Sequence, residues 1–212
     1  AEDGIRDDLV TGVQTCALPI SRNSASRLVN GKLIFYMPYS FIKYNYNGEF
    51  DIQLPAQAIR NRVGDINDWE EIIDESNIFM PIQETHYPVM HSVISCDLEK
   101  LDSSSKLCSA QSIIGPSSRE FYVSPNAVYL WVSQGYGNKD NSKAYRMALD
   151  NSNPGFIDVE GQPIDQFSFK ERDGYLNVLL RSQESNPNSL SLMKVDINKF
   201  DKSKVSFVRS EE

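Results

Sequence analysis

The same succession of short strands and polar turns occurs twice in the second half of the chain, about 46 residues apart. The first copy consists of the strand Phe121–Val123, the turn Ser124-Pro125-Asn126, the strand Ala127–Ser133, the polar loop GYGNKDNS and the returning strand Lys143–Asp150. The second copy consists of the strand Phe167–Phe169, the turn Glu171–Gly174, the strand Tyr175–Ser182, the loop SQESNPNS and the returning strand Leu190–Asp196. The β-branched and aromatic residues of these segments favour strands.

A longer version of the unit precedes these two copies. The turn Asn30-Gly31 leads into KLIFYMP, whose expected partner strand is YPVMHSVISCDL, with an insertion at about residues 45–85 between them. The inserted segment DINDWEEIIDE begins with Asp and carries apolar residues at helical spacing, which predicts a short helix. These apolar residues are Ile66, Trp69, Ile72 and Ile73. Connecting strands are expected at GFIDVEG and in the run that ends at Ser112–Gly115.

A period of about 40–50 residues with about four short strands per unit is typical of a β-propeller blade. Hairpin-linked strands also fit a sandwich or an open meander, but neither of these needs a repeat. We therefore predict an all-β fold over residues 22–208: a fragment of a β-propeller with about three four-stranded antiparallel blades and a short helical insertion in the first blade.

The two ends of the chain do not resemble natural protein. Val10 to Ser21, VTGVQTCALPIS, corresponds to a translated adapter of short-read DNA sequencing libraries, and AEDGIRD corresponds to the adapter segment before it. The final residues RSEE correspond to the adapter on the far side of an insert. We predict that residues 1–21 and 209–212 are adapter-derived and not native, that the protein continues beyond both ends, and that Cys16 is unpaired outside the core.

The charge of the chain argues against two classes of partner. The net charge is −8, and it stays mildly acidic when the two adapter-like ends are set aside. A nucleic-acid surface and a polybasic membrane patch both need clustered Lys and Arg. No apolar run approaches the length of a membrane span. We therefore expect no nucleic-acid partner and no membrane contact within this part of the protein.

Cys96 and Cys108 flank the polar, Ser-rich segment DLEKLDSSSKL. Two cysteines around a short polar loop are expected to form a local disulfide in an exported protein, although two reduced structural thiols also fit the pattern. Their spacing is not that of a zinc site, which needs four ligands in close pairs. We predict the disulfide, and with it a location outside the cytoplasm.

Three motifs carry a family resemblance: FYVSPNAVYLW, GQPIDQFSF and DGYLNVLLR. In this order and spacing they resemble secreted bacterial and archaeal proteins with a C-terminal β-propeller domain that is distantly related to WD repeats. The resemblance covers most of residues 28–200. It implies an exported protein, extracellular, periplasmic or anchored to a membrane on the outer side. It implies no known reaction and supplies no catalytic residues.

The candidates for a metal site are weak. His86 and His91 are the only histidines, and five residues apart on an extended strand they point to opposite faces, so a shared metal is not expected. Asp65, Asn67, Asp68 and Glu71 resemble a calcium loop but lack the required glycine and distal Glu, and a helix N-terminus explains them better. We expect no metal and no cofactor.

Asp165 and Gln166, in QPIDQFSF, lie between apolar residues, as in the turns between blades that a buried Asp locks in WD-type propellers. We predict a structural hydrogen bond in this turn and no catalytic role. No nucleophile elbow or phosphate-binding loop is present in the sequence.

The preferred interpretation is a non-catalytic, exported binding or scaffold module that contacts an unknown protein or glycan. The alternative is part of an extracellular hydrolase or lyase whose catalytic residues lie on blades outside this chain.

Overall fold

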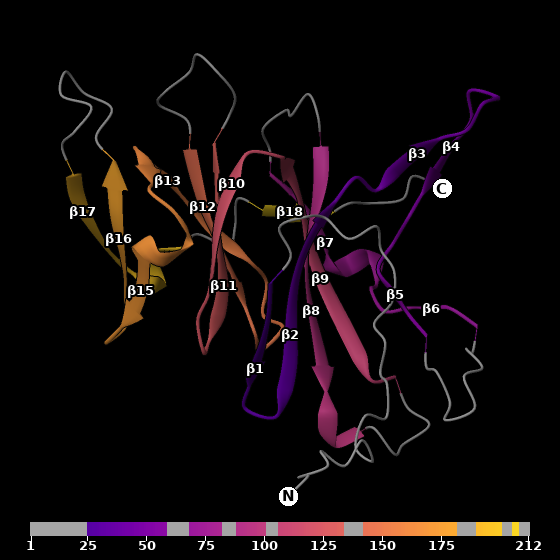
Figure 1. Ribbon diagram of the computed structural model, residues 1–212, viewed down its shortest axis with the longest axis horizontal. Coiled ribbons are helices and arrows are strands. Elements are labelled where there is room, and N and C mark those ends of the chain that lie inside the picture. Colours follow the sequence, from indigo (N-terminus) through magenta and orange to yellow (C-terminus); the bar gives the residue numbers. More distant parts are fainter. Residues whose placement is uncertain are drawn as a thin grey trace, which may run out of the picture.

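The computed structural model (Figure 1) describes residues 25–58, 68–81, 88–100, 106–133, 142–181, 190–200 and 205–207. These residues form eighteen strands and four short 3-10 helices, which confirms the predicted all-β class. In this described part of the chain, no helix is long and apolar enough to cross a membrane. The segments predicted to be adapter-derived, residues 1–21 and 209–212, lie outside the described residues, as does Cys16.

The first blade contains four antiparallel strands, each hydrogen-bonded to the next along the chain, with the insertion between the second and the third. They are β1 (Ala25–Val29), β2 (Lys32–Tyr39), β8 (Pro88–Asp97) and β9 (Cys108–Pro116). The turn between β1 and β2 consists of Asn30 and Gly31, with φ of 49° and 76°. Left-handed backbone at both central residues matches the twist of a tight hairpin, and Asn-Gly is the pair that adopts it most readily.

The second blade is a four-stranded antiparallel meander. Its strands are β10 (Arg119–Val123), β11 (Ala127–Ser133), β12 (Ser142–Ala148) and β13 (Gly155–Val159). The Ser124 hydroxyl closes the turn before β11 by accepting hydrogen bonds from the amides of Asn126 and Ala127 at 3.1 and 2.9 Å. Every residue from Val128 to Val132 is buried, in agreement with the prediction that this strand is central in its sheet.

The third blade is a four-stranded sheet built around one central strand. β14 (Gln162–Pro163) and β15 (Phe169–Arg172) lie on one edge of β16 (Tyr175–Arg181), and β17 (Leu190–Asp196) lies on the other. The predicted strand Phe167–Phe169 begins only at Phe169, because the residues before it form the 3-10 helix η3 (Gln166–Ser168). The next segment, β18 (Val205–Phe207), pairs antiparallel with β7 (Ile78–Pro81) of the insertion and not with β17. Because β7 pairs in parallel with β9, the sheet of the first blade has six strands and is not the predicted four-stranded antiparallel sheet.

The insertion in the first blade forms small hairpins in place of the predicted helix. Its elements are β3 (Ile42–Tyr44), β4 (Phe50–Ile52), β5 (Ala56–Gln57), β6 (Glu70–Glu71), η1 (Glu75–Asn77) and β7 (Ile78–Pro81). The helix predicted over DINDWEEIIDE is wrong in its described part, where the only helical turn is η1. Ile72 and Ile73 are both buried because the chain runs extended here. The Ile72 amide donates to the Pro55 carbonyl, and the Ile72 carbonyl accepts from the Ala110 amide.

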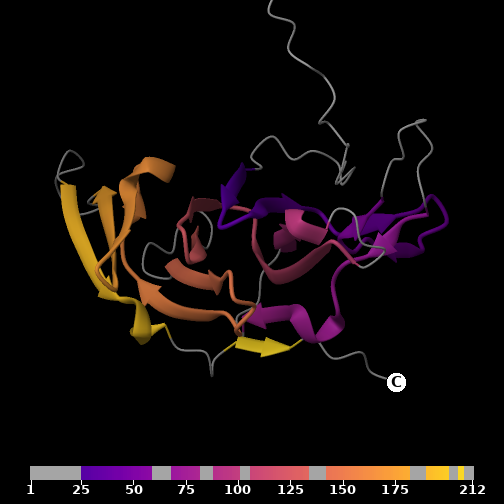
Figure 2. The same ribbon diagram turned by 90° about the horizontal axis from the view of Figure 1, so that it is seen from below.

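The apolar core is divided between neighbouring sheets, as expected for blades that pack face to face. One cluster joins blades 1 and 2 through Tyr36, Val93, Leu130 and Tyr145, among others. A second joins blades 2 and 3, and a third fills the space between blade 1 and the insertion. Figure 2 shows the sheets side by side in chain order.

A close backbone contact supports the junction of blades 2 and 3. After β17 the helix η4 (Ile197–Lys199) leads to Phe200, which is buried against β13. A Cβ atom at Gly155 would lie 2.8 Å from the carbonyl oxygen of Phe200. The position therefore needs a residue without a side chain, because the obstacle is backbone that cannot move independently.

Candidate functional site

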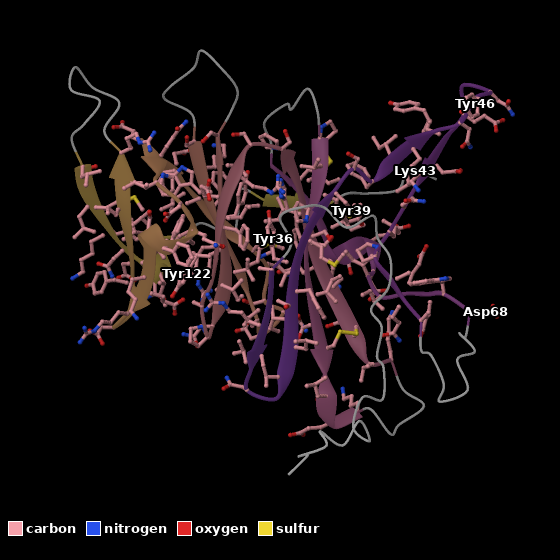
Figure 3. All side chains as sticks on the ribbon, in the orientation of Figure 1. Tyr36, Tyr39, Lys43, Tyr46, Asp68 and Tyr122 are labelled. Atoms are coloured by element: carbon pink, nitrogen blue, oxygen red, sulfur yellow. A yellow bond between two sulfur atoms is a disulfide. The ribbon has the colours of Figure 1, made fainter. Side chains whose placement is uncertain are left out.

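The hairpin formed by β3 and β4 projects away from blade 1, with Tyr46 at its tip (Figures 1 and 3). Its turn is closed by two backbone hydrogen bonds, from the Gly48 amide to the Asn45 carbonyl at 3.0 Å and from the Asn45 amide to the Glu49 carbonyl at 2.8 Å. Gly48 has φ of 81°, a left-handed conformation that suits glycine. The hairpin is therefore an ordered element that carries its side chains outward.

One face of this hairpin is apolar and exposed. Tyr44 lies opposite Phe50 in the register, and Ile42 lies opposite Ile52, so all four side chains share one face. Tyr44 is 77% exposed, Phe50 61% and Ile52 58%, while Tyr46 at the tip is fully exposed. Exposed aromatic and aliphatic side chains gathered on one element are typical of an interaction surface. We call Tyr44, Tyr46, Phe50 and Ile52 the aromatic hairpin face.

The opposite face of the hairpin is polar. Lys43 and Asp51 are opposite each other in the register, and the Asn45 side-chain amide donates to Asp51 Oδ2 at 3.2 Å. Apart from Lys43, every charged residue in the described parts of the insertion is acidic. These acidic residues are Glu49, Asp51, Asp68, Glu70, Glu71, Asp74 and Glu75, and all of them are exposed. The insertion thus presents exposed rings within a strongly negative surface.

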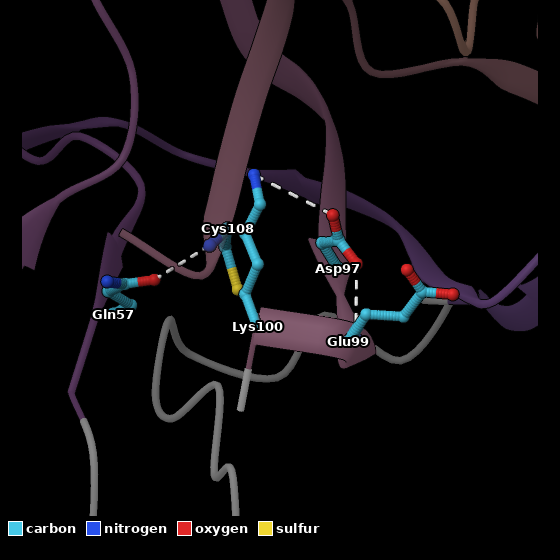
Figure 4. Close-up of polar contacts among 5 residues, drawn as sticks. All are labelled: Gln57, Asp97, Glu99, Lys100 and Cys108. Carbon is cyan, nitrogen blue, oxygen red and sulfur yellow. Dashed lines mark hydrogen bonds and ion pairs between the residues drawn. The ribbon is translucent and has the colours of Figure 1, made fainter. Parts of the chain in front are cut away.

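The disulfide lies within blade 1, next to a hydrogen bond that holds the insertion (Figure 4). Cys96 and Cys108 are directly opposite in the register of β8 and β9, with their Cα atoms 4.0 Å apart, and the predicted bridge joins them. The Cys108 amide donates to Gln57 Oε1 at 3.0 Å, and Gln57 Nε2 donates to Glu70 Oε2 at 3.1 Å. Gln57 therefore links β5 and β6 to the disulfide-bonded strand.

The loop that leaves β8 is also capped. The helix η2 (Leu98–Lys100) begins directly after Asp97, whose carboxylate accepts a hydrogen bond from the Glu99 amide at 3.1 Å and lies 3.6 Å from Lys100 Nζ (Figure 4). These contacts turn the chain at the end of the strand that carries Cys96. The bridge and the cap together fix the end of blade 1 on which the insertion rests.

His91 is a buried structural histidine. Its Nε2–H donates to the Pro116 carbonyl at 2.9 Å, so Nδ1 accepts from the Tyr36 hydroxyl, also at 2.9 Å. Burial, together with the nearby positive charge of Arg119, lowers the pKa of His91 to about 3 although the Pro116 bond opposes the shift. Both ring nitrogens are thus occupied within the fold, and the ring is neutral at physiological pH.

The other candidate metal ligands are only partly covered by the described residues. His86, Asp65 and Asn67 lie outside the described residues. Asp68 and Glu71 are exposed, and Glu71 belongs to strand β6. No group of three or more His, Cys, Asp or Glu side chains suited to a metal ion occurs in the described ranges of the chain.

Asp165 locks the turn before β15. Its Oδ1 accepts hydrogen bonds from the Phe167 amide at 2.8 Å and the Ser168 hydroxyl at 3.2 Å, while the Ser168 hydroxyl accepts from the Asp165 amide. This is a capping box around η3. Asp165 is exposed and not buried, and Gln166, also exposed, begins the 3-10 turn. Burial and the Asp165 charge raise the pKa of the Glu120 carboxyl on β10, against the opposing effect of Arg119.

Glu171 joins the second and third blades. Its carboxylate accepts hydrogen bonds from the Ser124 hydroxyl at 2.6 Å, the Asn126 side-chain amide at 2.7 Å and the Tyr129 hydroxyl at 2.9 Å. Burial raises the pKa of Glu171, but these donors and the nearby Arg146 outweigh it, so the pKa lies below its usual value. The sequence gives no local signal for this contact, since the partners belong to different blades.

The aromatic hairpin face was also missed by sequence reasoning, although its signal is present. The segment YNYNGEF places Asn-Gly between two aromatic positions, which is a strong short-range signal for a hairpin. The insertion was interpreted through its helical spacing instead. Recognition of the Asn47-Gly48 turn would have placed Tyr44 and Phe50 on facing strands.

The comparisons with known proteins agree with this geometry. No curated protein and no solved structure shows a significant match to the chain. The family described as the Beta propeller domain matches residues 21–205. This range contains the strands of all three blades, the insertion and the disulfide. The chain therefore belongs to the β-propeller domain family.

Proposed function

We propose that this protein is an exported, non-catalytic β-propeller module that binds a macromolecular partner, a protein or a glycan, through the aromatic hairpin face of its first blade. The proposal rests above all on one observation: Tyr44, Tyr46, Phe50 and Ile52 are exposed together on an ordered, projecting hairpin. A two-stranded hairpin has little stability of its own, and an apolar face on it is favourable only when something covers it. Tyr is also among the residues that contribute most to binding at interfaces.

The Cys96–Cys108 bridge supports the exported location. A disulfide persists in an oxidising compartment and is rare in the cytosol. This one is buried in blade 1, and the backbone of Cys108 also holds Gln57 of the insertion. We expect the protein produced in a bacterial periplasm to contain no free thiol at Cys96 or Cys108 under denaturing alkylation. Free thiols in a correctly folded periplasmic product would contradict the proposed location.

The alternative function, part of an extracellular hydrolase or lyase, would draw on the inner strands of the blades. Burial and Asp165 raise the pKa of Glu120, which is the direction that a general acid needs. Asp165, however, already caps η3 with its carboxylate. This engagement favours a structural role for the pair, so we retain binding as the proposal.

The test is a binding panel with three immobilised probes: a Lys-rich peptide, a Glu-rich peptide and a neutral oligosaccharide of N-acetylglucosamine. Biolayer interferometry compares the protein with a Tyr44→Ser, Phe50→Ser variant. The matched control is Leu190→Ser, Leu192→Ser, which removes two exposed apolar side chains from β17. We expect at least one probe to bind, and only the hairpin variant to lose that binding. Binding to no probe, or equal loss in both variants, would overturn the proposed function.

A further inference from the structure

We infer that the aromatic hairpin face docks a cationic partner, a Lys- or Arg-rich segment of another protein. This inference rests on the proposed binding function and adds the chemistry of the partner. Glu49 and Asp51 flank Phe50 in sequence, so carboxylates lie on the same hairpin as the exposed ring, with Asp51 on its opposite face. Aromatic faces attract ammonium and guanidinium groups, and carboxylates pair with them. The hairpin therefore combines the two groups that recognise basic side chains.

The charge around the hairpin extends this preference. Asp68, Glu70 and Glu71 add further exposed carboxylates on β6 and just before it, on the same side of blade 1 as the hairpin (Figures 1 and 3). None of Glu49, Asp51, Asp68, Glu70 and Glu71 forms a salt bridge with another described residue. Lys43, opposite Asp51, offsets one of these charges, and the excess of carboxylates leaves a negative field over the described surface that acts on charged groups within about 10 Å.

The rings of the hairpin are also not occupied by cations of the described chain. The two described cation–π contacts lie elsewhere: Lys194 Nζ is 4.1 Å from the Tyr175 ring centroid, and Lys143 Nζ is 4.7 Å from that of Phe156. Lys43, the one basic residue in the described insertion, points to the face opposite Tyr44 and Phe50. Among the described residues, no cation therefore covers the aromatic hairpin face, which leaves it open to a basic side chain of a partner.

Charge also separates this partner from two other occupants. A second copy of the chain would bring one acidic insertion against another, and like charges at an interface disfavour association. A neutral glycan would stack on the rings but would gain nothing from the surrounding carboxylate charge. A basic protein segment gains from both the rings and the charge, and its encounter with the surface is accelerated by long-range attraction.

The experiment measures fluorescence polarisation with a labelled peptide of alternating Lys and Ser. A peptide with Glu in place of Lys, and a labelled neutral oligosaccharide of N-acetylglucosamine, serve as competing probes. Two variants remove the two parts of the surface separately: Tyr44→Ala, Phe50→Ala removes rings, and Glu49→Gln, Asp51→Asn removes charge. Phe50→Tyr, which keeps a ring, and Glu160→Gln, which removes an exposed charge outside the insertion, are the matched controls. Circular dichroism checks that each variant is folded.

We expect the Lys peptide alone to bind, with affinity that falls as salt is raised. The ring variant should weaken binding about tenfold, since each exposed cation–π contact contributes a several-fold effect. The charge variant should weaken binding several-fold at low salt and less at high salt. Phe50→Tyr and Glu160→Gln should bind like the unaltered protein.

Four results would overturn the inference. Equal binding of the Lys peptide to the ring variant and to Glu160→Gln would show nonspecific attraction to an acidic protein. Binding of the oligosaccharide alone, lost with Tyr44→Ala, Phe50→Ala, would refute the cationic partner and leave the proposed function standing. Concentration-dependent dimerisation in light scattering, lost with the same variant, would identify a second copy as the occupant. Binding of no probe would refute both proposals.

Discussion

Acidification should destabilise this protein through His91 at pH values where carboxylates are still ionised. In the fold the ring is fully buried, its Nε2–H is bonded to Pro116, and its Nδ1 accepts from Tyr36. A proton on Nδ1 would turn the acceptor into a donor facing the Tyr36 hydroxyl, inside an apolar cluster and near Arg119. The folded protein therefore resists protonation of this ring, while the unfolded chain does not.

The magnitude follows from the two pKa values. The pKa of His91 is about 3 in the fold, against about 6.5 for a histidine in an unfolded chain. Because the folded pKa is lowered, the unfolded state binds the extra proton, so stability is complete above about pH 6.5 and falls as the pH decreases toward 3. At pH 5 the loss from this one group is about 2 kcal/mol, and it grows by about 1.4 kcal/mol for each further pH unit.

The assay is urea unfolding, followed by the fluorescence of Trp131, which is buried in the core of blade 2. The protein and a His91→Gln variant are compared at pH 8 and pH 5. The variant has a lower stability at both pH values, but it lacks the titrating ring, so its stability should change about 2 kcal/mol less between them. All other side chains are the same in the two proteins, so their contributions cancel in the comparison. Equal pH dependence in the two proteins would refute the assignment of a buried, neutral His91.

Three further predictions concern stability. Gly155→Ala places a Cβ atom 2.8 Å from the Phe200 carbonyl oxygen, so we expect a loss of about 1–3 kcal/mol; an unchanged melting temperature would show that the contact relaxes freely. Cys96→Ser, Cys108→Ser should cost about 3 kcal/mol in denaturant unfolding, and reductant should destabilise the unaltered protein but not this variant. Glu171→Gln should cost about 1–3 kcal/mol at pH 7, because it removes the charge that accepts three hydrogen bonds. The pKa of Glu171 is lowered, so this stabilisation is present above about pH 4.3 and is lost as the pH falls. The unfolding free energies of the variant and the parent should therefore converge in acid. A difference that persisted unchanged at pH 3 would contradict the role of the Glu171 charge.

The blade strands could be predicted because their signals are local. Ala127–Ser133 and Tyr175–Arg181 are rich in β-branched and aromatic residues and are bounded by turn residues, and both are central strands in the structure. The disulfide was also predictable, since a short polar loop between Cys96 and Cys108 fits a hairpin connection. In these regions local preference and tertiary packing agree, which is when sequence patterns are most reliable.

The insertion was predicted poorly because its burial is set by contacts distant in sequence. Ile72 and Ile73 fit a helical period, yet they are buried by the Pro55 segment and by β9, to which the chain is bonded through Ala110. The start of β15 was misplaced for a local reason: the Asp165 side chain competes for the Phe167 amide and forms a 3-10 turn where a strand was expected.

Of the candidate site, only the disulfide was predictable. Cys96 and Cys108 were identified, but the aromatic hairpin face was not, because exposure is a property of the folded surface. Glu171 illustrates the same limit. Its partners Ser124, Asn126 and Tyr129 become neighbours only when one blade packs on the next, so no spacing in the sequence marks them.

The cross-strand disulfide has a mechanical consequence for the hairpin. A partner held at Tyr46 would transmit tension along β3 and β4, which join blade 1 directly through β2 on one side and through β5 and Gln57 on the other. The second path ends at the Cys108 backbone, where the chain is covalently tied to Cys96 on the adjacent strand. A pull that reaches Cys108 by this path therefore meets a covalent link, and β9 cannot peel away from β8 one hydrogen bond at a time at this end while the bridge is oxidised.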